Sequence, residues 1–183
     1  YKTHIWPLFE STVGAYFHAA DSYLSKLDAI QEGYISKLSL CQQGAFLVYN
    51  FLPLRLRNIG ILGLLHKCVL GEEHESLAQF FSCAEDQTAP RRTRAFGYRH
   101  SKQIIDLCDA KSPDYLARSI LGMTYVYNLL PQDVVEAASV TICQRLLSDM
   151  AKQCCKEGRE FETFYCHLGV RERPFLNCMK HYS

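Results

Sequence analysis

Apolar residues recur along the chain at helical spacing, and this pattern predicts a mainly α fold. From Asp21 onward the apolar positions are three to five residues apart, which is typical of one face of an α-helix. Asp21 or Ser22 suits the N-terminal cap of this helix, because a short polar side chain accepts a hydrogen bond from the free N–H groups of the first turn. The positions expected to face the core are Leu24, Leu27, Ile30, Ile35 and Leu38.

Two further helices are expected in the first half of the chain. One covers residues 43–51 and ends where Pro53 restricts the backbone of the residue before it. The next begins at about Pro53, a residue suited to a first helical turn, and ends at about Leu70, with Gly71 as its C-terminal cap. It is apolar around most of its circumference, so we expect it to be the central buried helix.

The second half of the chain predicts two longer helices. Pro113 suits the start of a helix that runs to about Leu129, and Pro131 ends it. Ser139 is expected to cap a last helix over residues 140–155, by accepting hydrogen bonds from its first turn. The predicted buried face of that helix comprises Val140, Cys143, Leu146, Leu147 and Met150.

The part of the chain between these helices has weaker patterns. Residues 72–81 predict a short helix, residues 82–93 have loop composition, and residues 96–107 are expected to be extended or weakly structured. Acidic side chains are stabilising near the positive end of a helix dipole, so we assign that role at the start of the short helix to its clustered carboxylates. These are Glu72, Glu73 and Glu75.

The chain has the composition of a globular protein, with 183 residues of which 48% are hydrophobic and 21% charged. A fold of this length buries about 70% of the surface that the unfolded chain exposes, so it needs no metal or disulfide as its main support. We expect three parts: a helical bundle over residues 1–90, a basic connector with C-terminal helices over residues 91–157, and an irregular tail with Cys and His over residues 158–183.

The cysteines and the apolar stretches bear on the cellular setting. Nine cysteines is an odd number, and no secretion signal accompanies them, which favours reduced thiols in a nuclear or cytoplasmic protein, with structural disulfides as the alternative. The longest uncharged apolar stretch, residues 59–65, is far shorter than the roughly 20 residues that a bilayer requires. We therefore expect no membrane partner.

Charge is unevenly distributed, although the net charge is only +1. Residues 1–90 carry six basic and nine acidic side chains, whereas residues 91–183 carry fourteen and ten. The segment from Arg91 to Lys102, the basic segment, contains no acid and interleaves cations with aromatic rings, a pattern that suits phosphates and exposed bases. A solvated loop anchored by its aromatic residues is the alternative. The predicted contacts are Arg91, Arg92, Arg94, Arg99 and Lys102, with Phe96 and Tyr98 for stacking and with Arg55, Arg57 and Lys67 behind them.

Motifs for catalysis, cofactors and metals are largely missing from the sequence. The chain has no phosphate-binding loop, no dinucleotide fingerprint, no nucleophile elbow, no His-Glu-x-x-His and no Asp-Asp pair suited to a two-metal site. We expect no catalytic residue, no cofactor and no metal. Two alternatives remain: a Cys/His hydrolase, and zinc in the tail at Cys154, Cys155, Cys166, His167, Cys178 and His181, whose spacing is poor. His66 and Cys68 are interpreted as core or boundary residues.

Three segments share their order and spacing with a known family of proteins. The first has a Leu-Asp-x-x-Gln core, with Leu27, Asp28, Ile30 and Gln31. The second is PLRLRNIGILGLLHKCVLG, residues 53–71. The third contains Arg118, Ser119, Tyr127, Asn128, Leu130, Pro131, Ser139 and Leu147. Over roughly residues 1–150 the chain thus resembles the region after the palm in reverse transcriptases of non-LTR (LINE-type) retrotransposons, a class of transposable element.

The resemblance implies a thumb-like region of an RNA-directed DNA polymerase that is not an enzyme by itself. The catalytic palm would lie upstream in the same polyprotein and would be a partner, together with RNA or an RNA–DNA hybrid bound weakly and without sequence preference through backbone phosphates. Departures from the family pattern keep the helix core but remove positive charge: Tyr127 replaces the usual Trp, Cys143 the usual Phe, and Tyr125 and Gln144 stand where basic residues are frequent. The alternative function is a helical protein-interaction or structural remnant that binds no nucleic acid.

Overall fold

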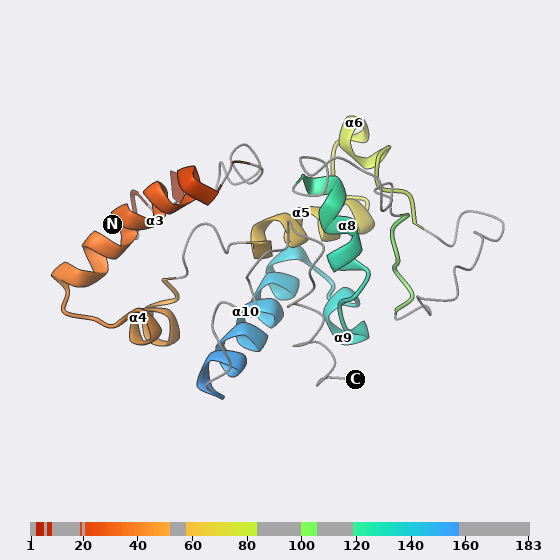
Figure 1. Ribbon diagram of the computed structural model, residues 1–183. Helices are drawn as coiled ribbons and strands as arrows, with labels where there is room; N and C mark the ends of the chain where they lie inside the picture. The colour runs from red at the N-terminus through yellow and green to blue at the C-terminus, as the bar shows by residue number, and fades with distance from the viewer. Residues whose placement is uncertain are drawn as a thin grey trace.

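The protein is mainly α-helical, as the hydrophobic pattern predicts. The computed structural model describes residues 3–5, 7–8, 19, 21–51, 58–83, 100–105 and 119–157. Within these ranges there is no strand, only one isolated bridge, and the helices are arranged as Figure 1 shows. They are α3 (Asp21–Lys37), α4 (Gln42–Tyr49), α5 (Asn58–Val69), α6 (Glu75–Ala78), α8 (Ile120–Tyr127), α9 (Gln132–Val135) and α10 (Val140–Lys156).

Helix α5 lies at the centre of the main hydrophobic core, where it packs against α8 and α10 (Figure 1). Its residues Ile61, Leu62 and Leu65 are almost completely buried, which confirms the prediction of a central buried helix. Gly63 allows α10 to approach closely, because a Cβ atom at that position would lie 2.3 Å from Nε2 of Gln144. The core contains residues from both sides of the basic segment, including Phe81 on one side and α8, α9 and α10 on the other.

The ends of α5 and α4 are made by residues with a left-handed backbone. Gly71 has φ 72°, and the N–H groups of Gly71 and Glu72 donate to the carbonyls of Cys68 and Lys67. This pattern ends a helix and satisfies its last carbonyl groups, so the predicted cap at Gly71 is confirmed. Helix α4 ends at Tyr49 because Asn50, with φ 59°, stops it before the predicted end at residue 51.

Helix α6 is much shorter than the helix predicted over residues 72–81. It contains only residues 75–78 and begins after His74, whose ring accepts a hydrogen bond from the N–H of Ser76. Of the three clustered carboxylates only Glu75 lies in its first turn. Glu72 instead follows α5, where its backbone N–H donates to the carbonyl of Lys67. The interpretation that all three complement a helix dipole was therefore too broad.

The buried face of α3 differs from the prediction. Ile35 is buried as expected, but Ile30 is 51% and Leu38 47% exposed, whereas Asp28 and Gln31 are buried. The reason is that α3 packs against α4 through a small second cluster of Ile35, Ala45 and Phe51. Residues three and four positions apart share a helix face, so Asp28 and Gln31 turn inward with Ile35, whereas Ile30 and Leu38 stay exposed.

The C-terminal helices follow the prediction in part. Helix α8 does not run unbroken through the predicted range 113–129, because Ser119 has an extended backbone and caps the helix by accepting a hydrogen bond from the N–H of Leu121. Helix α8 ends before Pro131 as predicted, and the short α9 was not predicted. Helix α10 begins after Ser139 as predicted, and Cys143 and Leu147 from its predicted face are fully buried. The predicted start at Pro113 lies outside the described residues. None of the described helices has the length and hydropathy needed to cross a membrane.

We expect replacement of Ser139 by Ala to lower the free energy of unfolding by about 1 kcal/mol, because the side chain accepts a hydrogen bond from the N–H of Ile142 at 3.3 Å. Ser139→Asp is the matched control and should retain most of the stability, since Asp also caps helices. Urea denaturation followed by circular dichroism measures the difference. An equal loss in both variants would contradict the capping role.

Candidate nucleic-acid interface

Two of the ten predicted nucleic-acid-binding residues, Lys67 and Lys102, lie within the described part of the chain. Lys67 lies on α5, and Lys102 is half-buried in the segment 100–105, which contacts the helical core. The other eight lie outside the described residues. They are Arg55, Arg57, Arg91, Arg92, Arg94, Phe96, Tyr98 and Arg99.

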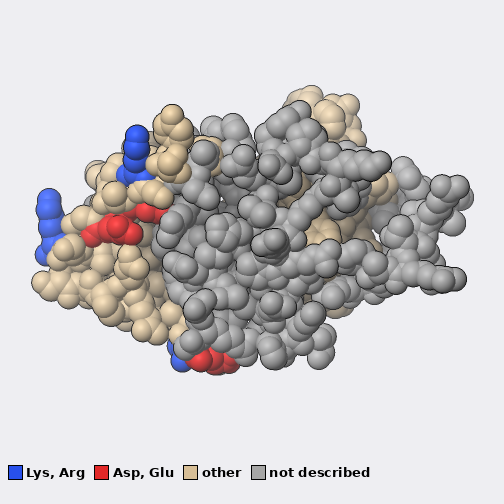
Figure 2. All heavy atoms as spheres, in the orientation of Figure 1, with Lys and Arg blue, Asp and Glu red and all other residues tan. Residues whose placement is uncertain are grey.

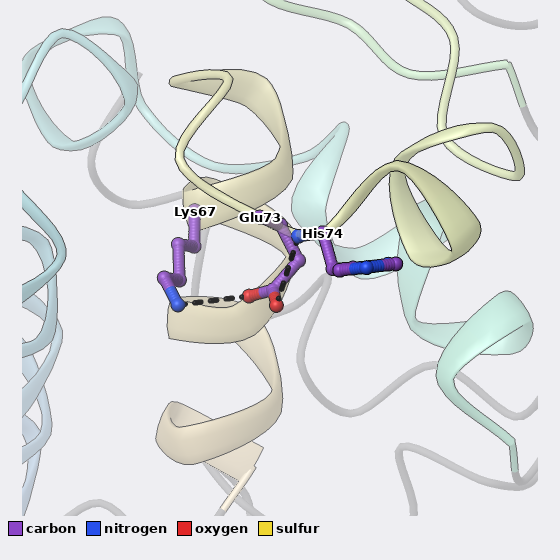
Figure 3. Close-up of polar contacts among 3 residues, drawn as sticks. All are labelled: Lys67, Glu73 and His74. Carbon is purple, nitrogen blue, oxygen red and sulfur yellow. Dashed lines mark hydrogen bonds and ion pairs between the residues drawn. The ribbon is translucent and has the colours of Figure 1, made fainter.

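Lys67 forms an ion pair with Glu73, whose Oε2 lies 3.1 Å from its Nζ (Figure 3). The hydrogen bond from Lys67, and then the one from the backbone N–H of His74, lower the pKa of the Glu73 carboxyl. The Lys67 side chain is 41% exposed, and a surface pair of this kind contributes little to stability. A phosphate therefore has to compete with Glu73 for Lys67, which makes this lysine a weaker contact than the sequence implied.

Two residues before its C-terminal end, the basic segment contains a buried histidine, His100. His100 is only 4% exposed, and its Nδ1 accepts a hydrogen bond from the backbone N–H of Lys102 at 3.2 Å. Its Nε2 donates to the carbonyl oxygen of Tyr127 at 3.1 Å, and its ring meets the Tyr127 ring edge-on. Burial lowers the pKa of His100, so at neutral pH it is an uncharged residue of the core and not a cation of the basic segment.

Tyr127 joins this histidine to the central helix. Its side chain is fully buried, and its hydroxyl lies 2.9 Å from Nδ1 of His66 on α5. Nε2 of His66 lies 2.9 Å from the carbonyl oxygen of Ala137, which can only accept. The neutral imidazole therefore donates from Nε2 and accepts the Tyr127 hydroxyl proton at Nδ1. His66 is a core residue as predicted, and burial, the largest effect, lowers its pKa.

Further bonds hold residues 100–105 against the end of α8. The side chain of Asn128 accepts from the N–H of Ile104 at 2.8 Å and donates to its carbonyl at 2.6 Å. Gln132 bonds both the N–H and the hydroxyl of Ser101, each at 3.0 Å. All these partners are neutral, so changes of salt concentration should not loosen this anchor.

The residues that flank the basic segment on either side contact each other. Cys83 and Ile104 form an isolated antiparallel bridge, and the N–H of Ile105 donates to the carbonyl of Ser82 at 3.0 Å. The arginines of the basic segment thus lie in sequence between two residues, Cys83 and Ile104, that bridge each other. Cations on a chain held at both ends lose less freedom on binding than cations on a free tail.

Two of the described cysteines, Cys68 and Cys143, are buried thiols. Burial, with smaller effects of neighbouring charges, raises the pKa of Cys68 to about 11, and burial raises that of Cys143 to about 11 as well, so both thiols stay protonated at neutral pH and are poor nucleophiles. Within the described ranges no three His, Cys, Asp or Glu side chains are placed to hold a metal ion. Of the tail candidates for zinc, only Cys155 has a described side chain, and it is buried.

The sequence did not predict that Tyr127 lies where three segments of the chain meet. His66 and His100 lie 61 and 27 residues from it along the chain, and no periodicity reports a contact across such distances. The one available signal was chemical: a tyrosine stands where the similar family has a tryptophan, and a buried phenol requires a partner for its hydroxyl. A histidine within the apolar α5 was the natural candidate for that partner.

We expect Tyr127→Phe to lower the free energy of unfolding by about 1–3 kcal/mol, because it leaves the buried Nδ1 of His66 without a donor. Tyr49→Phe, at a 46% exposed position, is the matched control and should have little effect. Chemical denaturation measures both. Equal stabilities of Tyr127→Phe and the unaltered protein would contradict the assigned hydrogen bond.

We also expect the folded state to lose stability as the pH falls below about 6.5, the ordinary value for histidine. The lowered pKa values of His66 and His100 mean that the unfolded chain binds more protons in this range, so stability is complete above the unfolded pKa and decreases toward the folded one. Urea midpoints between about pH 7.5 and 5.5 measure the slope. His66→Gln, which retains a donor for Ala137, should flatten it; an unchanged slope would exclude His66 as a contributor.

Protein-family models, curated proteins and solved structures were each compared with the chain, and none matches it. The resemblance to reverse transcriptases therefore rests on the residues of this chain. Several of those residues have a structural role in the described fold: Ser119 and Ser139 cap α8 and α10, and Asn128 forms a hydrogen bond with Ile104.

Proposed function

We propose that the chain binds the phosphate backbone of nucleic acid through its basic segment, carried by a helical body that performs no chemistry of its own. The observation that carries the proposal is the attachment of this segment at both ends, by the Cys83–Ile104 bridge and by His100 on Tyr127. In this role the chain corresponds to the thumb-like, non-catalytic part of a retrotransposon-type polymerase, next to a palm that lies elsewhere in the polyprotein.

The charge of the described helical body supports this assignment to the basic segment. The described residues carry seven Lys and Arg but ten Asp and Glu, so the body itself repels a polyanion weakly. On the face shown in Figure 2 the described cations are scattered among acids and form no continuous basic patch. Binding by this protein thus depends on the remaining residues, which carry thirteen basic and nine acidic side chains.

Arginines that contact phosphates release counterions from the nucleic acid, so the affinity should fall as the salt concentration rises. Each contact contributes about −0.9 to the slope of log affinity against log salt on a duplex, and about −0.7 on a single strand. Because such contacts are made to the backbone, RNA and RNA–DNA hybrids of different sequence should bind alike. Lys102, which remains half-buried, should add less than an exposed arginine.

We expect the full chain to bind a fluorescent RNA–DNA hybrid of about 20 base pairs at about 50 mM salt and to lose affinity steeply as salt rises. Replacing Arg91, Arg92, Arg94 and Arg99 together by Ala should weaken binding at least about tenfold and reduce the salt slope by about 3. The matched control replaces four exposed cations of the body by Ala and should bind like the unaltered protein. These are Lys26, Lys37, Arg145 and Lys156.

A second candidate function is a protein-interaction module that binds no nucleic acid. It is favoured by large apolar side chains at the surface of α3 and α4, where Tyr23 is 65%, Ile30 51% and Val48 71% exposed. The same titration separates the two functions. Absence of binding at low salt, or equal losses in the two fourfold variants, would reject the basic segment as a phosphate-binding site and leave the protein-interaction function.

A further inference from the structure

Two histidines of this protein make the same local turn in opposite environments. Nδ1 of His74 accepts the N–H of Ser76 at 3.2 Å, and Nδ1 of His100 accepts the N–H of Lys102 at the same distance. His74 is exposed, and Figure 3 shows its ring pointing away from Lys67 and Glu73. His100 is buried and holds the carbonyl of Tyr127 through its other nitrogen.

Protonation affects the buried turn far more than the exposed one. An imidazolium has two N–H donors and no acceptor, so protonated His100 would point a donor at the N–H of Lys102 and lose that bond. It would also place a charge in a site that is 4% exposed. His66 tolerates a proton better, because the hydroxyl oxygen of Tyr127 can accept from its Nδ1.

The groups around His100 offer its charged form little compensation. From α8 it meets the ring and carbonyl of Tyr127, and its own segment contributes Lys102, which is itself a cation. On α9, Gln132 bonds Ser101 and also Glu136, and Glu72 acts on His66. In the described part of the chain no carboxylate hydrogen-bonds His100, so the positive charge is stabilised better by solvent.

We propose that His100 is an acid-operated latch at the end of the basic segment. Neutral His100 belongs to the core and holds residues 100–102 against α8; protonated His100 leaves the core and releases them. Release stops at Ile104, because its two bonds to Asn128 and its burial do not depend on pH. If the proposed function holds, on which this consequence rests, the freed imidazolium adds a cation to the segment and strengthens polyanion binding in acid.

Hydrogen exchange of the backbone amides of Ser101 and Lys102 tests the latch directly. The measured exchange rates are first corrected for the intrinsic exchange rate at each pH. If only the released state binds the proton, the equilibrium constant for release of residues 100–102 should rise at most about tenfold between pH 7.5 and 5.5. His100→Asn keeps an acceptor for Lys102 but does not titrate, so its exchange should show no such rise. His74→Asn makes the same change in the exposed turn and should behave like the unaltered protein.

Several results would overturn the latch: no rise in the unaltered protein, an equal rise in His100→Asn, or a rise that disappears in His66→Gln but persists in His100→Asn. If His100→Asn does not fold, His100→Gln, which retains a donor for Tyr127, replaces it.

Binding of the RNA–DNA hybrid at the two pH values provides the second readout, and acid should strengthen it only where His100 is present. Acid-dependent exchange without any binding would support the latch and reject the proposed function. Binding that responds to salt without acid-dependent exchange would do the reverse.

Discussion

The burial of one phenol, that of Tyr127, organises the described structure. A buried hydroxyl and a buried carbonyl each require a partner, and here the partners are His66 on the central helix and His100 at the end of the basic segment. Burial lowers the pKa of both histidines and so favours their neutral forms. The three segments that meet at Tyr127 are therefore held by hydrogen bonds with defined directions in addition to apolar contact, and their relative placement is specific.

The described helical body differs in charge from the basic segment that the proposed function uses. The described helical body is slightly acidic, burial raises the pKa of the Cys68 and Cys143 thiols, and burial lowers the pKa of His66 and His100. Between Cys83 and residues 100–105, which the body holds, the sequence carries Arg91, Arg92, Arg94 and Arg99 without an acid after Asp86. A body that holds both sides of such a stretch is the arrangement that the proposed function requires.

A smaller hydrophobic cluster lies between α3 and α4. It buries Ile35, Ala45 and Phe51, with the ring of Tyr34 edge-on to that of Phe51, and leaves apolar residues of α3 at the surface. Phe46 of α4 belongs to the main core, so α4 connects the two clusters. Among the described residues the main core contains none from α3.

The linear pattern by itself determined the helical class, the central place of α5 and the caps at Gly71 and Ser139, because period, capping chemistry and backbone freedom are local properties. It also placed His66 in the core, since an apolar helix surrounds it. Tertiary structure alone decided which side of α3 is buried, that Lys67 pairs with Glu73, and that His100 is a neutral core residue at the end of a basic run. The buried side of α3 and the neutral His100 depend on separate segments of the chain meeting in space, whereas Lys67 and Glu73 are six residues apart and meet across the turn that follows α5. Burial, which sets the charge of a histidine, exists only after the segments have met.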